Sequence, residues 1–130
     1  FKKNVSLQSG WFVDPVFQVY QHERNVEILY LLRDVFGAGS VYRKGGKSAV
    51  MVFGIHSRRS IKEKVIPFFK RYPLVIKRRS FELFVEIVER LEKKEHFEKG
   101  GLERIYKLAV QMNLQGKGRK YKIEDLTKER

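Results

Sequence analysis

The sequence contains no cysteine, which excludes disulfide bonds, a thiolate nucleophile and Cys-based zinc or iron–sulfur sites. No apolar run approaches the roughly 20 residues that a membrane-spanning helix needs, so we expect no contact with a membrane. With 130 residues, the chain is too short for a large multidomain enzyme. Its hydrophobic content of 42% can still fill the core of one domain.

The amino terminus carries neither an initiator methionine nor a signal peptide. The chain opens on Phe1, and nothing near it has the basic and apolar regions of a secretory signal. We therefore expect a processed chain, a fragment, or a piece of a longer polypeptide. We also expect an intracellular protein, in the cytoplasm or in an organelle such as a chloroplast or mitochondrion, that is not secreted.

Acidic residues are scarce in the middle of the chain. Residues 42–79 hold twelve lysines and arginines but one acid, Glu63, so this segment supplies +11 of the total formal charge of +13. The remaining residues hold sixteen basic and fourteen acidic side chains, which is typical of an ordinary solvated surface. A concentrated basic segment favours a polyanion such as nucleic acid, with a lipid-binding or merely solubilising patch as the alternative.

Familiar catalytic and metal-binding patterns are missing. The three histidines are far apart and have no carboxylate or thiol at ligand spacing, which argues against a zinc site. Residues 45–48 spell Gly-Gly-Lys-Ser, but Val41 stands where a phosphate-binding loop needs glycine, so a hairpin turn explains them better. No pair of carboxylates suggests a hydrolytic metal site.

Hydrophobic periodicity predicts strands and helices in a mixed order. We expect strands over residues 1–7, 11–23, 40–43 and 49–55. We expect helices over residues 25–35, from 60, from 77 or 80 to about 94, and over 102–112. Residues 1–112 then form the folded domain, and residues 113–130 form a basic, loosely ordered tail.

This order predicts an α+β fold with one antiparallel sheet backed by helices. The other face of such a sheet is left for water or a ligand. By strand parity, Gln18, His22, Ser40, Tyr42 and Lys44 are candidates for that free face. A polar and basic sheet can lie along a DNA groove, where alternate side chains reach the base edges.

Several segments together resemble one known family. They are residues 10–21 (GWFVDPVFQVYQ), 35–40 (VFGAGS) and 64–74 (KVIPFFKRYPL), followed by Lys77, Phe81 and Phe84. In this combination the chain resembles the single-motif LAGLIDADG homing endonucleases over residues 1–112. The resemblance implies an αββαββα fold whose four-stranded antiparallel sheet covers the DNA major groove. It also implies a homodimer that cuts double-stranded DNA at a long, specific site with Mg²⁺.

The namesake helix of that family does not occur in this sequence. The resemblance places that helix, with its metal-binding terminal acid, before Phe1, so we expect no metal ligand in this chain. It further implies that the helix builds the interface with a second LAGLIDADG half. We therefore expect the chain as given not to cleave DNA by itself.

The resemblance also implies site residues. Gln21 matches a polar position near the scissile phosphate, and Lys77 matches a basic position that stabilises charge or orders water during catalysis. Strand parity combined with the resemblance predicts DNA-facing positions, namely Lys2, Asn4, Phe12, Asp14, Val16, Gln18, Ser40, Tyr42, Lys44, Lys47 and Met51. Phosphate contacts are expected from Arg58, Arg59, Lys62, Arg78 and Arg79.

Different chemistry is expected at different DNA-facing positions. Phe12, Val16 and Met51 offer apolar contacts, for example with thymine methyl groups. Gln18 can read adenine with two hydrogen bonds, and Asp14 can accept one from cytosine.

Two other functions remain open from the sequence. One is a non-cleaving binder on the same fold, either a maturase-like RNA splicing factor or an inactive DNA-binding relic. The other is a generic basic RNA-binding protein of ribosomal type. Competition between duplex DNA and structured RNA separates the RNA-binding alternatives from the DNA-binding ones, and cleavage with Mg²⁺ separates the enzyme from a non-cleaving binder.

Overall fold

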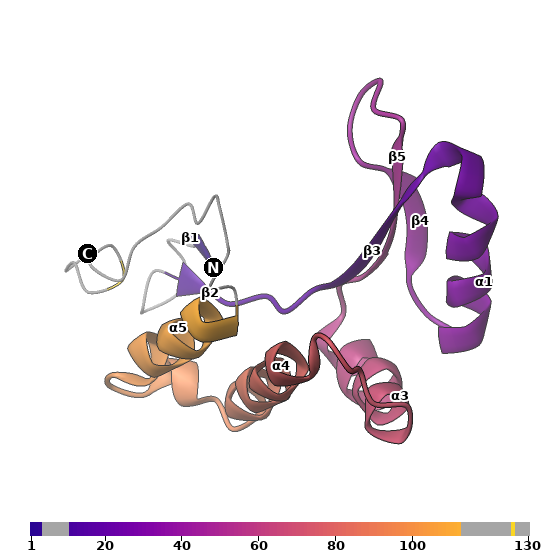
Figure 1. Ribbon diagram of the computed structural model, residues 1–130. Helices are drawn as coiled ribbons and strands as arrows, with labels where there is room; N and C mark the ends of the chain where they lie inside the picture. Colours follow the sequence, from indigo (N-terminus) through magenta and orange to yellow (C-terminus); the bar gives the residue numbers. More distant parts are fainter. Residues whose placement is uncertain (4–10, 113–125, 127–130) are drawn as a thin grey trace. The chain divides into compact units, whose positions relative to one another are not determined.

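A computed structural model describes residues 1–3, 11–112 and 126 of the chain (Figure 1). Its strands are β1 (Lys2–Lys3), β2 (Trp11–Phe12), β3 (Phe17–His22), β4 (Ser40–Arg43) and β5 (Val50–Ile55). Its helices are α1 (Val26–Phe36), α2 (Arg58–Ser60), α3 (Ile66–Arg71), α4 (Arg78–Glu92) and α5 (Gly101–Met112). The α+β class is confirmed. None of the helices in the described ranges is long and apolar enough to cross a membrane.

The chain forms two compact units. One comprises residues 15–72, and the other comprises residues 1–14 together with 73–130. The single domain predicted over residues 1–112 is thus built from two clusters of contacts. Asn4 and all of the predicted tail except residue 126 lie outside the described residues.

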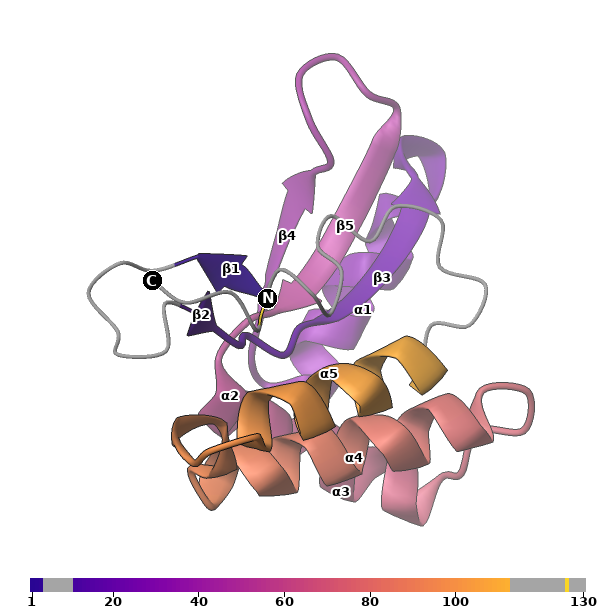
Figure 2. The ribbon, with the colours of Figure 1, turned by 90° about the vertical axis from the view of Figure 1, so that its left-hand side faces the viewer.

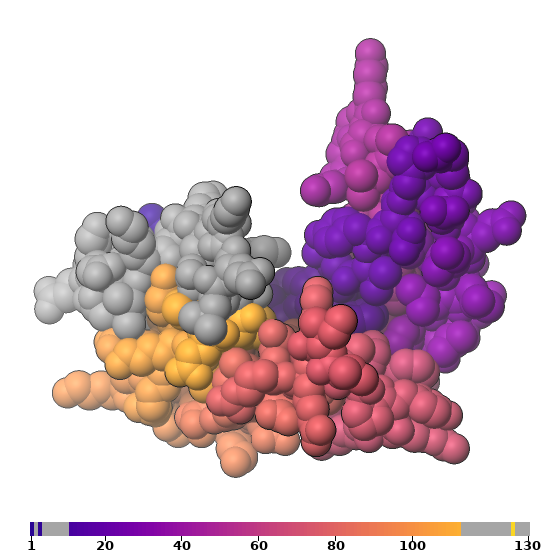
Figure 3. All heavy atoms as spheres, in the orientation of Figure 1, coloured from indigo at the N-terminus to yellow at the C-terminus, as the bar shows by residue number. Residues whose placement is uncertain are grey.

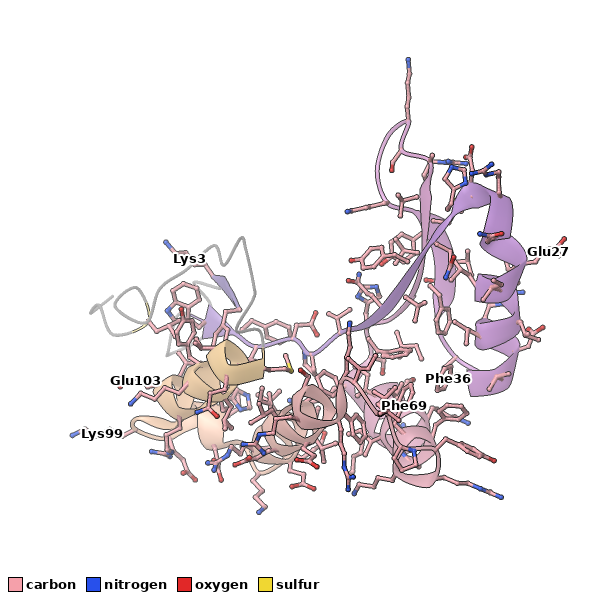
Figure 4. The ribbon with its side chains drawn as sticks, in the orientation of Figure 1. Lys3, Glu27, Phe36, Phe69, Lys99 and Glu103 are labelled. Carbon is pink, nitrogen blue, oxygen red and sulfur yellow. The ribbon has the colours of Figure 1, made fainter. Side chains whose placement is uncertain are left out.

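The unit of residues 15–72 contains a three-stranded antiparallel sheet in the order β3-β5-β4. Figure 2 shows β5 between its two neighbours, with α1 behind them. Phe36 at the end of α1 packs against Phe17 and Phe53 of the sheet, with ring centroids 5.5 and 6.0 Å apart. Phe69 of α3 closes the same cluster, 6.3 Å from Phe36 (Figure 4). One face of the sheet is therefore a hydrophobic core.

Local signals set the ends of α1. Asn25, the first residue of the helix predicted over residues 25–35, occupies the N-cap position, although its side chain makes no capping hydrogen bond. At the other end Gly37 adopts φ 64°, and its N–H donates to the carbonyl oxygen of Arg33 at 2.9 Å. Glycine takes this left-handed conformation without a steric penalty, which ends the helix at Phe36.

The long strand predicted over residues 11–23 is interrupted. Residues 13–16 are not in a strand, and the interruption contains Pro15, which has no N–H to donate to a ladder. As a result β2 pairs with β1, whereas β3 pairs with β5. Among the described residues the predicted four-stranded sheet is thus two antiparallel sheets.

The helix expected from Ser60 begins earlier. Ser57 is the N-cap of α2, because its side-chain oxygen accepts a hydrogen bond from the backbone N–H of Ser60 at 3.3 Å. A π-helical turn, Ile61–Val65, then joins α2 to α3. Pro67 follows directly in the first turn of α3, where a missing N–H costs little.

The other unit is built on α4 and α5. Leu91 of α4 and Ile105 of α5 are completely buried and belong to one apolar cluster, which also contains Trp11. Phe1 packs edge-on against Tyr106, with ring centroids 5.4 Å apart. A 3-10 turn, Glu95–Phe97, connects the two helices. This unit therefore has an apolar core of its own.

Candidate nucleic-acid interface

The register of the three-stranded sheet sorts its side chains onto two faces. Gln18 and Ser40 both lie opposite Gly54, while Tyr20 and Tyr42 both lie opposite Val52. Directly opposed residues of an antiparallel sheet share a face, and neighbours along a strand alternate. We call the side opposite α1 the open face; it carries Gln18, Tyr20, His22, Ser40, Tyr42, Val50, Val52, Gly54 and, just beyond the strands, Lys44 and His56.

Met51 is not on the open face, contrary to the prediction. Its register partners are Gln21 and Arg43, which share the α1 side of the sheet with Phe53. The β4–β5 hairpin pairs even-numbered residues with even-numbered ones, as Ser40 with Gly54 shows. An odd-numbered residue of β5 therefore faces the helix.

Hydrogen bonds join the polar side chains of the open face in a row. The Tyr20 hydroxyl donates to Gln18 Oε1 at 2.8 Å, and Gln18 Nε2 donates to the Tyr42 hydroxyl at 3.0 Å. The Tyr42 hydroxyl is in turn 3.1 Å from His56 Nε2. Two strands and the residue after a third thus contribute to one polar network, the Gln18 network.

Basic side chains flank this network. Lys44 Nζ lies 5.3 Å from the centre of the Tyr20 ring, a cation–π contact. The β4–β5 loop, which contains the exposed Lys47, projects beyond the rest of its unit (Figure 3). Both lysines can therefore meet a ligand that lies along the open face.

Arg43 has a structural role within the same hairpin. Its Nη1 donates to Glu23 Oε2 at 2.8 Å and to the carbonyl oxygen of Ser48 at 2.7 Å. The hydrogen bond from Arg43 lowers the pKa of the Glu23 carboxyl below its ordinary value. This contact ties the end of β3 to the hairpin, so the Arg43 charge is already balanced.

His22 also has a local partner. Its Nδ1 accepts a hydrogen bond from the backbone N–H of Arg24 at 3.1 Å and so caps the 3-10 turn Glu23–Asn25. The ring holds the chain where β3 leads into α1.

The residues expected to hold phosphates lie at helix starts. Arg59 of α2 pairs with Glu63 at 3.1 Å, and Arg78 and Arg79 of α4 each pair with Glu82 at 3.5 Å. Exposed pairs of this kind contribute about 0–1 kcal/mol, so a phosphate can compete for these guanidinium groups. Lys62 is exposed and Arg58 is half-buried.

The DNA-facing positions predicted near the amino terminus are only partly described. Phe12 is 45% exposed, while its neighbours Trp11 and Val13 are buried, so Phe12 lies on the outer side of β2. The backbone of Lys2 pairs with that of Phe12. Asp14 and Val16 are both half-buried, in the segment between β2 and β3.

The two predicted catalytic residues belong to different units. Gln21 is half-buried on the α1 side of the sheet, opposite Met51. Lys77 is exposed directly before α4, where its carbonyl oxygen accepts a hydrogen bond from the Phe81 N–H at 2.9 Å. Within the described ranges no three His, Asp or Glu side chains come together as a metal site. These residues alone do not fit the Mg²⁺ that the family resemblance implies.

Five residues of the open face were not predicted from the sequence, namely Tyr20, Val50, Val52, Gly54 and His56. Tyr20 and His56 take part in the Gln18 network, and Gly54 lies beneath it. Tyr20 has the parity of Gln18, so alternation along β3 was a usable signal for it. His56 and Gly54 could be found only from the register of β5.

An antiparallel sheet with a helix on one face and a polar, basic row on the other is suited to a nucleic-acid groove. A family model for LAGLIDADG endonucleases matches residues 1–88. The chain belongs to this family, and the resemblance seen in its sequence is confirmed.

The curated relatives that the chain matches are longer than the chain itself. The DNA endonuclease I-CeuI of Chlamydomonas moewusii is 44% identical over 71 residues, or 55% of this chain and 33% of that protein. The homing endonuclease I-ApeII of Aeropyrum pernix is 34% identical over 76 residues, or 58% of this chain and 44% of that protein. The chain thus spans less than half the length of either relative.

Solved structures agree with this assignment. The crystal structure of a homing endonuclease, I-TnaI, has a TM-score of 0.84 and 31% identity, covering 96% of this chain and 82% of that one. The structure of the meganuclease I-SmaMI bound to uncleaveable DNA has a TM-score of 0.81 and 28% identity. The match covers 86% of this chain and 38% of the I-SmaMI chain. A further I-SmaMI structure holds an uncleaved DNA target in the presence of calcium ions.

Proposed function

We propose that this chain binds double-stranded DNA along its open face and acts in a site-specific endonuclease of the homing type. The observation that carries the proposal is the Gln18 network, a row of polar side chains on the sheet face that α1 leaves uncovered. Structural neighbours in complex with DNA and relatives with endonuclease names support the same function.

Base reading in this proposal is divided among the exposed side chains. Gln18 and Lys44 contact base edges in the major groove, and Ser40 and Tyr42 lie on the same face. Phe12, Asp14, Val16 and Lys2 are further DNA contacts in this proposal, as is Asn4, which lies outside the described residues. Lys47, Arg58, Arg59, Lys62, Arg78 and Arg79 hold phosphates, which fixes the register without reading sequence.

Cleavage in this proposal needs more than the described residues supply. We assign Gln21 a role near the scissile phosphate and Lys77 the stabilisation of charge that develops on it. A divalent cation, Mg²⁺, is required, with its acidic ligand on the segment that the family resemblance places before Phe1. A homodimer, or a second LAGLIDADG half, completes the site, and the protein works in a cell compartment that contains the target DNA.

A selection and competition experiment tests this proposal. The chain is mixed with a random-sequence duplex DNA library, and the bound duplexes are sequenced and then competed with folded RNA. We expect a preferred duplex site of several base pairs that folded RNA displaces poorly. Stronger binding to RNA, with no preferred duplex, would instead support the maturase-like alternative.

Cleavage is tested separately on a plasmid that carries the selected site. With Mg²⁺ and the complete dimeric enzyme, we expect a cut at that site which EDTA abolishes. The chain alone is expected to bind this plasmid without cutting it.

A further inference from the structure

The side-chain amide of Gln18 is held at both of its ends. Tyr20, two residues along the same strand, donates to the amide oxygen at 2.8 Å. Tyr42, on β4, receives a hydrogen bond from the amide nitrogen at 3.0 Å. An amide with a single partner can turn over at little cost, but turning this one would require both tyrosine hydroxyls to exchange their donor and acceptor roles.

Counting hydrogen-bonding groups shows what remains for a ligand. A glutamine amide has two N–H donors and two lone pairs on its oxygen. Tyr20 uses one lone pair of the amide oxygen and Tyr42 uses one N–H of the amide nitrogen. One N–H donor and one lone pair therefore remain for a ligand. Adenine presents an acceptor (N7) beside a donor (the N6 amino group) in the major groove, which matches this remaining pair.

The next bond in the row supports the same orientation. Tyr42 accepts from Gln18, so the single hydroxyl proton of Tyr42 is available to His56 Nε2, 3.1 Å away. If the amide were turned over, the Tyr42 hydroxyl would have to donate its proton to Gln18 Oε1. The hydrogen bond between Tyr42 and His56 would then need a proton on His56 Nε2, with the Tyr42 oxygen as the acceptor. The orientation of Gln18 is therefore coupled to two residues beyond it.

The backbone makes room for this arrangement. A Cβ atom on Gly54 would lie 2.7 Å from His56 Nε2 and 2.9 Å from the Tyr42 hydroxyl oxygen, both too close for ordinary contacts. Beneath the tyrosine rings, Val52 is only 1% exposed, so a packed floor supports them. The network is built into the sheet.

We infer that Tyr20 and Tyr42 are positioning residues that fix the orientation of the Gln18 amide, so that Gln18 reads adenine at one position of the target site. This inference rests on the proposed function, since it takes duplex DNA to lie along the open face. Each tyrosine hydroxyl then contributes to specificity at the base pair that Gln18 contacts.

The test compares base preferences of the full chain and three variants on the same random-sequence duplex library. Wild type should prefer adenine at one position by about 5- to 150-fold, the discrimination usual for one bidentate contact. Gln18→Ala identifies that position by losing the preference there. Tyr20→Phe and Tyr42→Phe, which delete only a hydroxyl, should each lower the preference at that position and leave the other positions unchanged.

Tyr30→Phe is the matched control, because Tyr30 is an exposed tyrosine on α1 and lies off the open face. Melting temperatures check that every variant is folded. In the free protein, the two Nε2 proton resonances of Gln18 should differ in chemical shift in wild type. The Nε2 proton that donates to Tyr42 should move upfield in Tyr42→Phe because it loses its acceptor, while the other Nε2 proton shifts less.

Each result has one meaning for the inference. If both tyrosine variants keep the full preference at the Gln18 position, the inference is overturned and the proposed function stands. It is also overturned if they weaken all positions equally, or change a different position, because the hydroxyls would then act structurally or read bases directly. If wild type selects no duplex sequence, the proposed function fails and this inference fails with it.

Discussion

Gly54 leaves the space that the Tyr42 side chain occupies: a Cβ atom at this glycine would lie 2.9 Å from the Tyr42 hydroxyl oxygen and 3.2 Å from Cε1. The glycine lies in the middle of the sheet, opposite Gln18 on one neighbouring strand and Ser40 on the other. A side chain added at Gly54 would therefore displace Tyr42, which is hydrogen-bonded to the proposed base-reading residue Gln18.

Gly54→Ala should displace Tyr42 and His56 while the fold survives. Overpacking of this kind typically costs about 1–3 kcal/mol in the free energy of unfolding. We expect a lower melting temperature together with a weaker base preference at the Gln18 position. Gly45→Ala is the control, because a Cβ there meets no atom within 4 Å. Full base preference in Gly54→Ala would show that the close approach is unimportant for recognition.

Lys44→Ala should reduce the preference for particular base pairs. Lys44 lies over the Tyr20 ring at the edge of the open face, within reach of the same groove. We expect a loss of about 1–3 kcal/mol in discrimination at one position, measured by competition between selected and mutated duplexes. Lys99→Ala removes the same charge outside the basic segment and should leave discrimination intact. An equal loss on cognate and random DNA would make Lys44 a phosphate contact.

Arg58→Ala should weaken binding to every duplex alike. A phosphate contact contributes through counterion release, so its loss lowers the slope of log affinity against log salt by about 1. The measurement is a titration of one duplex at several salt concentrations, repeated with a random duplex. Arg104→Ala, in α5, is the control. A change confined to the selected duplex would assign Arg58 to base reading.

Glu23→Gln should destabilise the protein in a pH-dependent way. The hydrogen bond from Arg43 lowers the pKa of Glu23 in the folded state, so this carboxylate stabilises the fold at and above its ordinary pKa. That contribution is lost as the pH falls through the folded-state pKa. The melting temperatures of wild type and Glu23→Gln should therefore differ at pH 7 and converge in strong acid.

The control for this comparison is Glu27→Gln. Glu27 is on α1 and points away from the sheet (Figure 4), so its replacement should change the melting temperature little at either pH. A difference for Glu23→Gln that stays constant down to strong acid would exclude the pairing with Arg43 as its cause.

Leu91→Ala should destabilise the unit that contains α4 and α5. Leu91 is fully buried in the apolar cluster, and truncating such a leucine typically costs about 2–5 kcal/mol. Denaturant unfolding measures the loss. Val75→Ala, at a side chain that is 90% exposed, should leave the free energy of unfolding nearly unchanged. Similar losses in both variants would contradict the assigned core.

Local signals were sufficient for most of the elements. Helix α1 lies between an N-cap asparagine and a C-terminal glycine, and the β4–β5 hairpin has alternating strands around a glycine turn. The interrupted strand was not foreseen, because residues on both sides of Pro15 have strong β propensity and the effect of its missing N–H depends on the partner strand. The start of α2 was misplaced because Ser57 and Ser60 are both good capping residues.

The candidate site was only partly predictable. Parity along β3 and β4 placed Gln18, Ser40 and Tyr42 correctly on the open face. Met51 was placed wrongly because a strand after a turn takes its parity from the register of the hairpin. The hydrogen bonds of the Gln18 network join residues up to 24 positions apart, and such contacts follow from the folded register alone.

The most direct test of the central claim is to map which face of the chain meets duplex DNA. Backbone and side-chain NMR resonances of the labelled chain would be followed as the selected duplex is added. Our account predicts shifts at Gln18, Tyr42 and Lys44 on the open face, with little change at Ile28, Leu31 and Val35 on the exposed side of α1. Shifts confined to α1, or an open face unchanged at saturating duplex, would contradict it.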